Sequence, residues 1–261
     1  MLLNREAIFD YYLVVKRIIN VNTLDDLRAR SFVAAKINCS FTRTNFRKIF
    51  QKIHRRNIFI FGASPTLEDD IEGLREILFK RKSKITIVSV DGATKALIDY
   101  GIYPDIVVTD LDGDFEALFK AAFNGAVMVI HAHGDNISAL RKYLGKLFPY
   151  SIYTTQLEPE GCVENYGGFT DGDRALFLAL KFSASKIFLV AMDFGEIVGK
   201  YSKPWLKHNI KAWETKKKKF QIAKELIAKV AVNKVFTLGK SRIKNFNVKH
   251  LDYFEVENII Q

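Results

Sequence analysis

Short apolar runs alternate with amphipathic stretches along the chain from residue 57 onward. Each apolar run has the length of a buried strand, and most are followed by a stretch whose apolar residues have helical spacing. The predicted strands are 58–61, 85–90, 106–109, 126–130, 151–154, 186–191 and 235–238, and the predicted helices are 66–79, 93–100, 115–123, 137–148 and 173–182. Repeated strand–helix units of this size predict an α/β fold, with a Rossmann-like, mostly parallel sheet and helices on both faces.

The first 56 residues follow a different pattern, and we expect 1–56 to form a small helical cap that precedes an α/β catalytic domain at 57–261. Residues 4–38 have helical spacing and predict two helices, with Thr23 at the start of the second. The segment 40–56 is mixed and basic, and it fits either a linker or a third helix. These N-terminal helices are also candidates for a homodimer contact.

Acidic side chains gather where two predicted strands end. Asp91 follows one strand directly, and Asp110, Asp112 and Asp114 follow the next. Right-handed crossovers place the carboxyl ends of parallel strands on one edge of the sheet, where such sheets bind ligands. Clustered carboxylates need a cation, and Mg²⁺ held by carboxylates and substrate phosphates is the natural candidate. Each acid taken alone is equally well explained as a turn or helix-cap residue.

Other polar loops are predicted to lie on the same edge. The loop 62–66 joins a strand to a helix start, which is a phosphate-binding geometry, although three acids in the first helical turn disfavour a bare phosphate. His131 and His133 follow another strand, but they lack a clear set of zinc ligands. The segment 161–172 contains four glycines and fits either a mobile lid or a plain surface connection.

The order of these motifs resembles the archaeal 6-hydroxymethyl-7,8-dihydropterin pyrophosphokinase family of the MptE type, whose acidic core is related to that of thiamine pyrophosphokinase. The motifs that carry the resemblance are Gly62-Ala63-Ser64-Pro65-Thr66-Leu67, Asp91-Gly92-Ala93, Pro104-Asp105, Thr109-Asp110-Leu111-Asp112, His131-Ala132-His133-Gly134-Asp135-Asn136, Gly168-Phe169-Thr170-Asp171-Gly172-Asp173-Arg174 and Met192-Asp193-Phe194-Gly195. Ser64 stands where the family usually has glycine, which puts the contacts of that loop in question.

The resemblance implies an enzyme (EC 2.7.6.3) that uses Mg²⁺ and transfers diphosphate from ATP to 6-hydroxymethyl-7,8-dihydropterin, releasing AMP. The expected catalytic residues are Asp91, Asp110, Asp112, Asp114 and Arg174. The expected Mg²⁺ ligands are Asp110, Asp112 and Asp135. ATP is expected to contact Gly62, Ala63, Ser64, Pro65, Thr66, Gly92, His133 and Asn136. The pterin is expected to contact Thr170, Asp171, Asp173 and Asp193. The alternative is a thiamine pyrophosphokinase-like enzyme with another acceptor alcohol.

The net charge of +11 is concentrated in one region. Between Lys200 and His250 there are fifteen Lys or Arg and two Glu, so the rest of the chain is slightly acidic. The run Lys216–Lys219 lies in a predicted helix at 205–232, and a solvated helix face is the favoured interpretation. A basic rim that attracts nucleotide is the functional alternative. Nucleic-acid binding is the rival function of a different class; it leaves the acidic loops unexplained, so no such partner is expected.

Two further features concern the compartment. No apolar run approaches the roughly 20 residues of a membrane span, and the first residues lack the pattern of a signal peptide. The chain is therefore expected to be cytoplasmic, with no membrane partner. Two cysteines do not make a disulfide scaffold or a zinc site, and both Cys39 and Cys162 are expected to be reduced thiols in the core. Residues 243–261 are expected to close the sheet edge or to pack outside it.

Overall fold

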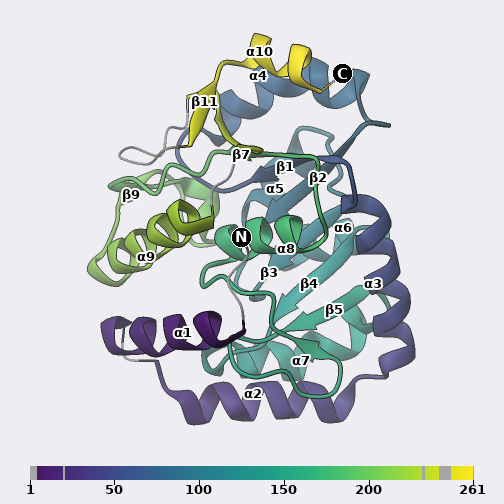
Figure 1. The fold of residues 1–261 in the computed structure, drawn as a ribbon, viewed down its shortest axis with the longest axis vertical. Helices are drawn as coiled ribbons and strands as arrows, with labels where there is room; N and C mark the ends of the chain where they lie inside the picture. The colour runs from purple at the N-terminus through teal and green to yellow at the C-terminus, as the bar shows by residue number, and fades with distance from the viewer. Residues whose placement is uncertain (1–4, 20, 231–232, 241–247, 261) are drawn as a thin grey trace.

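The computed structural model describes residues 5–19, 21–230, 233–240 and 248–260 (Figure 1). Within them, one sheet has nine strands in the order β11-β10-β7-β1-β2-β3-β4-β5-β6, and all its pairings are parallel. The strands are β1 (Asn57–Phe61), β2 (Ile85–Val90), β3 (Ile106–Thr109), β4 (Val127–His131), β5 (Ser151–Thr154), β6 (Val163–Glu164), β7 (Lys186–Val190), β10 (Val235–Leu238) and β11 (Lys249–Leu251). The predicted α/β fold with a parallel sheet is confirmed.

The strand order reverses at β1. From β1 the chain adds strands on one side as far as β6, and then β7 returns to pair with the other side of β1. The loops that leave β1 and β7 therefore diverge above the sheet. Open parallel sheets bind ligands in the crevice at such a point, outside the carboxyl ends of the strands.

Ten α-helices surround the sheet within the described residues. They are α1 (Arg5–Ile19), α2 (Thr23–Lys36), α3 (Cys39–Ile53), α4 (Leu67–Lys80), α5 (Ala93–Asp99), α6 (Phe115–Phe123), α7 (Ile137–Leu147), α8 (Asp171–Lys181), α9 (Glu214–Val230) and α10 (Tyr253–Ile259). Three short 3₁₀ turns are η1 (Gly134–Asn136), η2 (Phe148–Tyr150) and η3 (Lys200–Ser202), and β8 (Ile197–Val198) pairs antiparallel with β9 (Ile210–Lys211).

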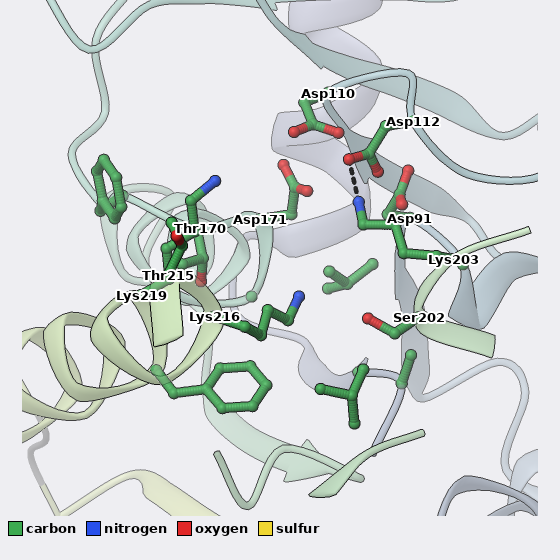
Figure 2. A pocket seen from close by; sticks show the side chains of 18 of the residues that line it. Asp91, Asp110, Asp112, Thr170, Asp171, Ser202, Lys203, Thr215, Lys216 and Lys219 are labelled. Atoms are coloured by element: carbon green, nitrogen blue, oxygen red, sulfur yellow. Dashed lines mark hydrogen bonds and ion pairs between the residues drawn. The ribbon is translucent and has the colours of Figure 1, made fainter. Parts of the chain in front are cut away.

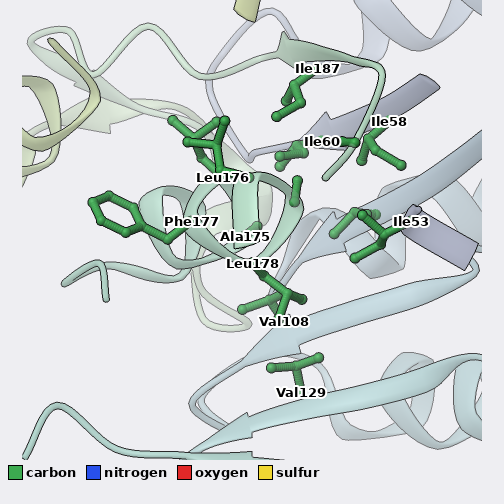
Figure 3. Packing of buried hydrophobic residues seen from close by; sticks show 14 of the residues in the cluster. Ile53, Ile58, Ile60, Val108, Val129, Ala175, Leu176, Phe177, Leu178 and Ile187 are labelled. Carbon is green, nitrogen blue, oxygen red and sulfur yellow. The ribbon is translucent and has the colours of Figure 1, made fainter. Parts of the chain in front are cut away.

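Alternation along the central strand divides the core into two layers. Ile58 and Ile60 pack with α3, α8 and α9, whereas Phe59 and Phe61 pack with α4 and α5 on the opposite face. Figure 3 shows α8 lying across the first of these faces. Because both faces are covered, the strands are mostly apolar on both faces and most of their few polar residues are buried, as is typical of parallel sheets. Farther along the sheet, α6, α7 and α2 cover the second face.

The N-terminal region forms three helices. The two predicted in 4–38 are confirmed, but Asn22, not Thr23, caps α2, because its side chain accepts a hydrogen bond from the Leu24 backbone N–H at 3.1 Å. The segment 40–56 is a third helix rather than a linker, and its Ile49 lies in the same apolar cluster as the β1 residues. Helix α3 thus packs as part of the α/β body, and the domain boundary after residue 56 stays a prediction.

Two predictions near the C-terminus need correction or completion. The helix expected at 205–232 is wrong in its start: α9 begins at Glu214, because residues before it form β9 and turns. Its last two predicted residues, 231–232, lie outside the described residues. Of the final segment, β11 extends the sheet edge and α10 packs on α4, while 241–247 also lie outside the described residues.

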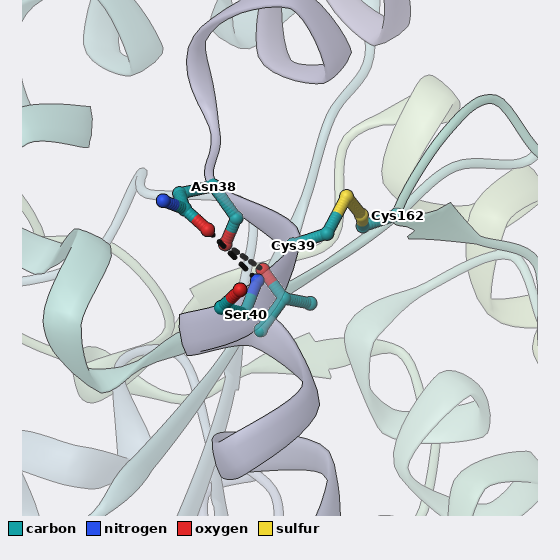
Figure 4. Close-up of a disulfide and its surroundings, with 5 residues drawn as sticks. Asn38, Cys39, Ser40 and Cys162 are labelled. Carbon is teal, nitrogen blue, oxygen red and sulfur yellow. Dashed lines mark hydrogen bonds between the residues drawn. A yellow bond between two sulfur atoms is a disulfide. The ribbon is translucent and has the colours of Figure 1, made fainter.

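The expectation of two reduced core thiols is wrong. Cys39 and Cys162 form a disulfide, with Cα atoms 5.7 Å apart, and neither residue is fully buried (Figure 4). The sequence argument excluded a scaffold of several bridges but could not exclude a single one. Packing of α3 against β5 brings the start of α3 beside the loop that leads into β6. The bridge ties this glycine-containing connection to α3.

Within the described residues, no helix is both long enough and apolar enough to cross a bilayer.

Candidate active site

A cavity of about 430 Å³ opens above the carboxyl ends of the strands. Its walls come from the loops after β1, β2, β3, β4 and β7, from the start of α8, and from the segment 197–203. The starts of α2 and α9 complete the rim. Loops that are far apart in the sequence therefore line one cavity, as expected because parallel strands end on the same edge of the sheet.

The backbone turns sharply where three strands end. Asp91, Leu111 and Ala191 have φ values of 42°, 66° and 51°, and they follow β2, β3 and β7 by one or two residues. Such values lie in the left-handed region, which residues with a side chain seldom adopt. These turns change the chain direction at the sheet edge and so direct the neighbouring carboxylates toward the cavity.

Three carboxylates meet at the edge of the cavity. Asp91, Asp110 and Asp112 each offer an oxygen, and these oxygens all lie within 4.8 Å of one another (Figure 2). Oδ1 of Asp110 is buried and has no hydrogen-bond partner among the described residues. A buried acceptor without a partner is costly, and a cation among the three carboxylates would satisfy it. An all-oxygen donor set of this kind suits Mg²⁺.

The electrostatics of the cluster also indicate a cation. Burial, together with repulsion from Asp112 and Asp110, raises the pKa of Asp91 well above its usual value. Burial likewise raises the pKa of Asp171, again with repulsion from Asp110 and Asp112. Burial acts in the same direction on Asp110, but a hydrogen bond and charge attraction from His133 outweigh it and lower that pKa. A cation bound here would favour the ionised form of all these groups.

A lysine already faces the cluster. Lys203 forms an ion pair with Asp112. Burial alone would lower the pKa of Lys203, but attraction to Asp112, Asp91 and Asp110 raises it. The pair is half-buried, and it brings a permanent positive charge to the side of the cavity next to the carboxylates.

Close backbone approaches hold the segment that carries this lysine. A Cβ on Gly92 would lie 1.7 Å from the carbonyl oxygen of Tyr201, and one on Gly199 would lie 2.4 Å from the carbonyl oxygen of Ala63. Both positions therefore require glycine for contact rather than for φ. The segment is thus clamped against the loops after β1 and β2, and Gly92 also lines the cavity.

The histidine loop contributes one side chain to the cluster. His133 lines the cavity, and its Nε2 lies 3.3 Å from Oδ2 of Asp110. Asn136 fixes the loop from behind, since its Nδ2 donates to the carbonyl oxygens of Asp110 and His131 at 2.6 Å each. Asp135 also lines the cavity, but its side chain is 91% exposed and is not part of the three-carboxylate group.

Only part of the loop after β1 lines the cavity. Gly62, Ala63 and Ser64 line the cavity. Pro65 and Thr66 are not among its lining residues. The Thr66 hydroxyl instead points along α4 and donates to Asp70 at 2.7 Å.

Four predicted residues lie at the start of α8 or near it. Thr170 and Asp171 line the cavity, as does Asp193 from the loop after β7. Asp173 is fully buried and caps α8, accepting a hydrogen bond from the Thr170 backbone N–H at 2.9 Å. Asp173 therefore supports the loop from behind the cavity wall.

Two of the predicted catalytic residues, Asp114 and Arg174, form hydrogen bonds within the protein and do not line the cavity. Asp114 caps α6, with its Oδ1 accepting from the Ala117 backbone N–H at 2.9 Å, and it is not among the lining residues. Arg174 is buried behind the wall, where Nη2 donates to Oε1 of Gln156 at 3.2 Å. The structure does not place either side chain on the cavity surface.

Sequence reasoning missed several residues of the wall. Lys203 lies after the last recognised motif, and Asp26 lies in the N-terminal helices. Lys216 and Lys219 line the cavity from α9, whereas Lys217 between them is exposed. The solvated-face interpretation of the four-lysine run is thus wrong for Lys216 and Lys219. Helical spacing places Lys216 and Lys219 on one face of α9 and Lys217 on another. It does not tell which of the two faces meets the cavity.

A family model described as 6-hydroxymethylpterin diphosphokinase MptE-like matches residues 32–199. The chain belongs to this MptE-like family. A protein named 6-hydroxymethyl-7,8-dihydropterin pyrophosphokinase from Pyrococcus furiosus is 47% identical over 193 residues, which cover 74% of this chain and 78% of that protein. A protein of the same name from Methanocaldococcus jannaschii is 45% identical over 186 residues, covering 69% of this chain and 76% of its own.

One solved structure has a more distant likeness. The MAf glycosyltransferase from Magnetospirillum magneticum AMB-1 covers 80% of this chain and 38% of its own, at 13% identity and a TM-score of 0.44. This likeness adds nothing to the family assignment.

Proposed function

We propose that this MptE-like protein transfers a diphosphate group from ATP to 6-hydroxymethyl-7,8-dihydropterin and releases AMP. The observation that carries the proposal is the cluster of Asp91, Asp110 and Asp112 beside the cavity, in a chain 47% identical to a protein named for that reaction. A cavity of about 430 Å³ is in the range that holds a small-molecule ligand.

Asp91, Asp110 and Asp112 would hold the Mg²⁺ ion, and the orphaned Oδ1 of Asp110 supports this assignment. When bound, the ion neutralises phosphate charge and stabilises the oxygens that gain charge during transfer. This set replaces Asp135 of the sequence-based set with Asp91. The aspartate side chains fix the position of the site, because they are anchored at the ends of neighbouring strands.

The reaction requires one bond to form and one to break. The hydroxymethyl oxygen of the pterin attacks the β-phosphorus of ATP, and the bond from that phosphorus to the oxygen bridging the α-phosphorus breaks. AMP leaves with the bridging oxygen, and the hydroxyl proton passes to a carboxylate. Asp114 stays our sequence-based candidate for this acceptor, while Asp171, unlike Asp114, lies on the cavity wall.

The remaining residues of the wall bind and orient the substrates. We assign the nucleotide to Gly62, Ala63, Ser64, Gly92 and His133, which line the cavity near the carboxylates. We assign the pterin to Thr170, Asp171 and Asp193, because a carboxylate pairs well with an amino-pyrimidinone edge. Asp173, Arg174 and Asn136 act from behind the wall, by holding these loops in place. Positioning of this kind accounts for most of the catalysis in phosphoryl transfer.

The identity of the acceptor alcohol distinguishes this proposal from the alternative, a thiamine pyrophosphokinase-like enzyme. The purified protein is incubated with ATP and Mg²⁺, together with either 6-hydroxymethyl-7,8-dihydropterin or thiamine, and AMP and the diphosphate product are quantified. We expect AMP and pterin diphosphate in equal amounts with the pterin, and none with thiamine. Product formed with thiamine and not with the pterin would show that thiamine is the acceptor. No AMP with either alcohol would overturn the proposal.

A further inference from the structure

Helix α9 begins at the cavity. Its first turn places Thr215 and Lys216 on the cavity wall, and Trp213 just before it lines the same wall. In Figure 2, the side chain of Lys216 extends from α9 into the cavity with its amino group directed toward the carboxylates. This helix lies beyond residue 199, where the family match ends, so the family motifs say nothing about it.

Among the described residues, the amino group of Lys216 has aromatic neighbours but no ionic partner. Its Nζ lies 5.1 Å from the ring centre of Phe220 and 6.0 Å from that of Trp213. No ion pair involves it among the described residues, whereas Lys203 pairs with Asp112, and Lys217 pairs with Glu214 at 2.7 Å. A half-buried ammonium group without a counter-ion is unfavourable, and an anion in the cavity would correct this.

Two groups of charged side chains line different walls of the cavity. Asp91, Asp110 and Asp112, with Lys203 paired to Asp112, lie at the strand ends, and Lys216 and Lys219 line the wall contributed by α9. A polyphosphate that shares a divalent cation with the carboxylates would present its remaining oxygens to the lysines. The positive end of a 17-residue helix adds to the attraction for an anion at this position.

We propose that Lys216 binds the phosphate chain of the nucleotide substrate, and that α9 is a nucleotide-binding element of this protein outside the family-matched segment. The choice of ATP as the nucleotide rests on the proposed function. Burial, and repulsion from Lys203 and Lys219, lower the pKa of Lys216. An adjacent phosphate chain would reverse this effect and keep the amino group charged.

Direct binding of nucleotide tests the assignment. The affinity of the full chain for ATP with Mg²⁺, without any acceptor, is measured by calorimetry for wild type, Lys216→Met and Lys217→Met. Lys217→Met is the matched control, because Lys217 is the next lysine on the same helix and faces solvent. We expect Lys216→Met to weaken binding about 10- to 100-fold, the effect of losing one charged hydrogen bond. Lys217→Met should bind as wild type, and Lys216→Arg should recover part of the loss.

The outcomes separate this inference from the proposed function. Equal affinities for wild type, Lys216→Met and Lys217→Met would overturn the inference, even if AMP forms with the pterin. A higher KM for the pterin in Lys216→Met, with an unchanged affinity for the nucleotide, would also overturn the inference, because Lys216 would then contact the acceptor. The inference would be supported if only Lys216→Met lost affinity for the nucleotide. If wild type at the same time formed no AMP with the pterin, the proposed acceptor would be wrong. The thermal midpoints of the two Met variants show that both are folded.

Discussion

The carboxylates of Asp91 and Asp110 meet because the backbone turns sharply directly after their strands. The sequence predicts that these acids share one edge of the sheet, since that follows from parallel topology alone. It does not decide whether Asp91 or Asp135 joins Asp110 and Asp112, because side-chain direction depends on local φ values such as the 42° at Asp91. At the scale of single residues, the edge is predictable and the ligand set is not.

A buried histidine beside the cluster gives a pH-dependent prediction. His131 is 3% exposed, and burial, with repulsion from Arg174 and His133, lowers its pKa well below the usual value of 6.5. The unfolded chain therefore takes up a proton near pH 6.5 that the folded protein does not, so stability is complete above that pH and falls as the pH decreases. Between pH 7.5 and 5.5 the free energy of unfolding should lose about 1 kcal/mol from this group.

Urea unfolding at the two pH values measures this loss. His131→Gln should show a smaller decrease between pH 7.5 and 5.5 than wild type, by about that amount. His208→Gln, at an exposed histidine, should keep the wild-type pH dependence. The same decrease in His131→Gln and in wild type would contradict the neutral, buried state of His131.

The strands and helices of the sheet are the elements that periodicity predicts best. Strands β2, β3, β5 and β10 have the predicted bounds, because short apolar runs between turn residues have few other interpretations. Strands β6, β8 and β9 have two residues each, which is too short for any periodic signal. The sequence does not predict the start of α9, because residues 205–213 contain no Gly or Pro that would mark a helix end there. The docking of α2 onto η1 depends on side-chain contacts that no periodicity reveals.

One buried carboxylate joins α2 to the rest of the site. Asp26 is 1% exposed, and it accepts hydrogen bonds from the Tyr12 hydroxyl at 2.8 Å, the Gly134 backbone N–H at 2.8 Å and Nε2 of Gln156 at 2.7 Å. Asp26→Ala leaves three donors without this partner, so we expect a loss of roughly 2–4 kcal/mol in the free energy of unfolding.

Chemical denaturation of Asp26→Ala, with Asp25→Ala as the matched control, checks the role of this contact. Asp25 is the preceding residue on the same helix, and it forms an exposed ion pair with Arg28. Its replacement should change stability by less than about 1 kcal/mol, as is usual for surface pairs. Similar effects of the two substitutions would show that Asp26 does not anchor α2.

At the scale of the whole molecule, the sheet positions the cavity and the disulfide links two distant parts of the chain around it. Cys39 and Cys162 are 123 residues apart in sequence, and the bridge joins α3 to the connection that leads to the Thr170 side of the cavity. No sequence pattern indicates this pairing, because it depends on how α3 packs on β5. The strand order, by contrast, places the cavity where a parallel sheet with a reversal is expected to bind ligands.

The disulfide should contribute to global stability. Closing a loop of this length in the unfolded chain is expected to stabilise the fold by roughly 2–5 kcal/mol. We therefore expect a reductant to lower the thermal midpoint of wild type, and to leave that of the double variant Cys39→Ser/Cys162→Ser unchanged. A wild-type midpoint that does not respond to complete reduction, verified by thiol titration, would rule out this contribution.

We propose that the carboxylates at the strand ends act through a divalent cation in diphosphate transfer. The most direct measurement is the rate of AMP formation from ATP and the pterin as Mg²⁺ is titrated, for wild type, Asp110→Asn and the surface control Asp99→Asn. We expect a chelator to abolish, and Mg²⁺ to restore, the activity of wild type and Asp99→Asn. Asp110→Asn should lose at least about 100-fold in rate at every Mg²⁺ concentration. A rate for Asp110→Asn equal to that of wild type, or full activity in the presence of chelator, would show that these carboxylates do not act through a divalent cation.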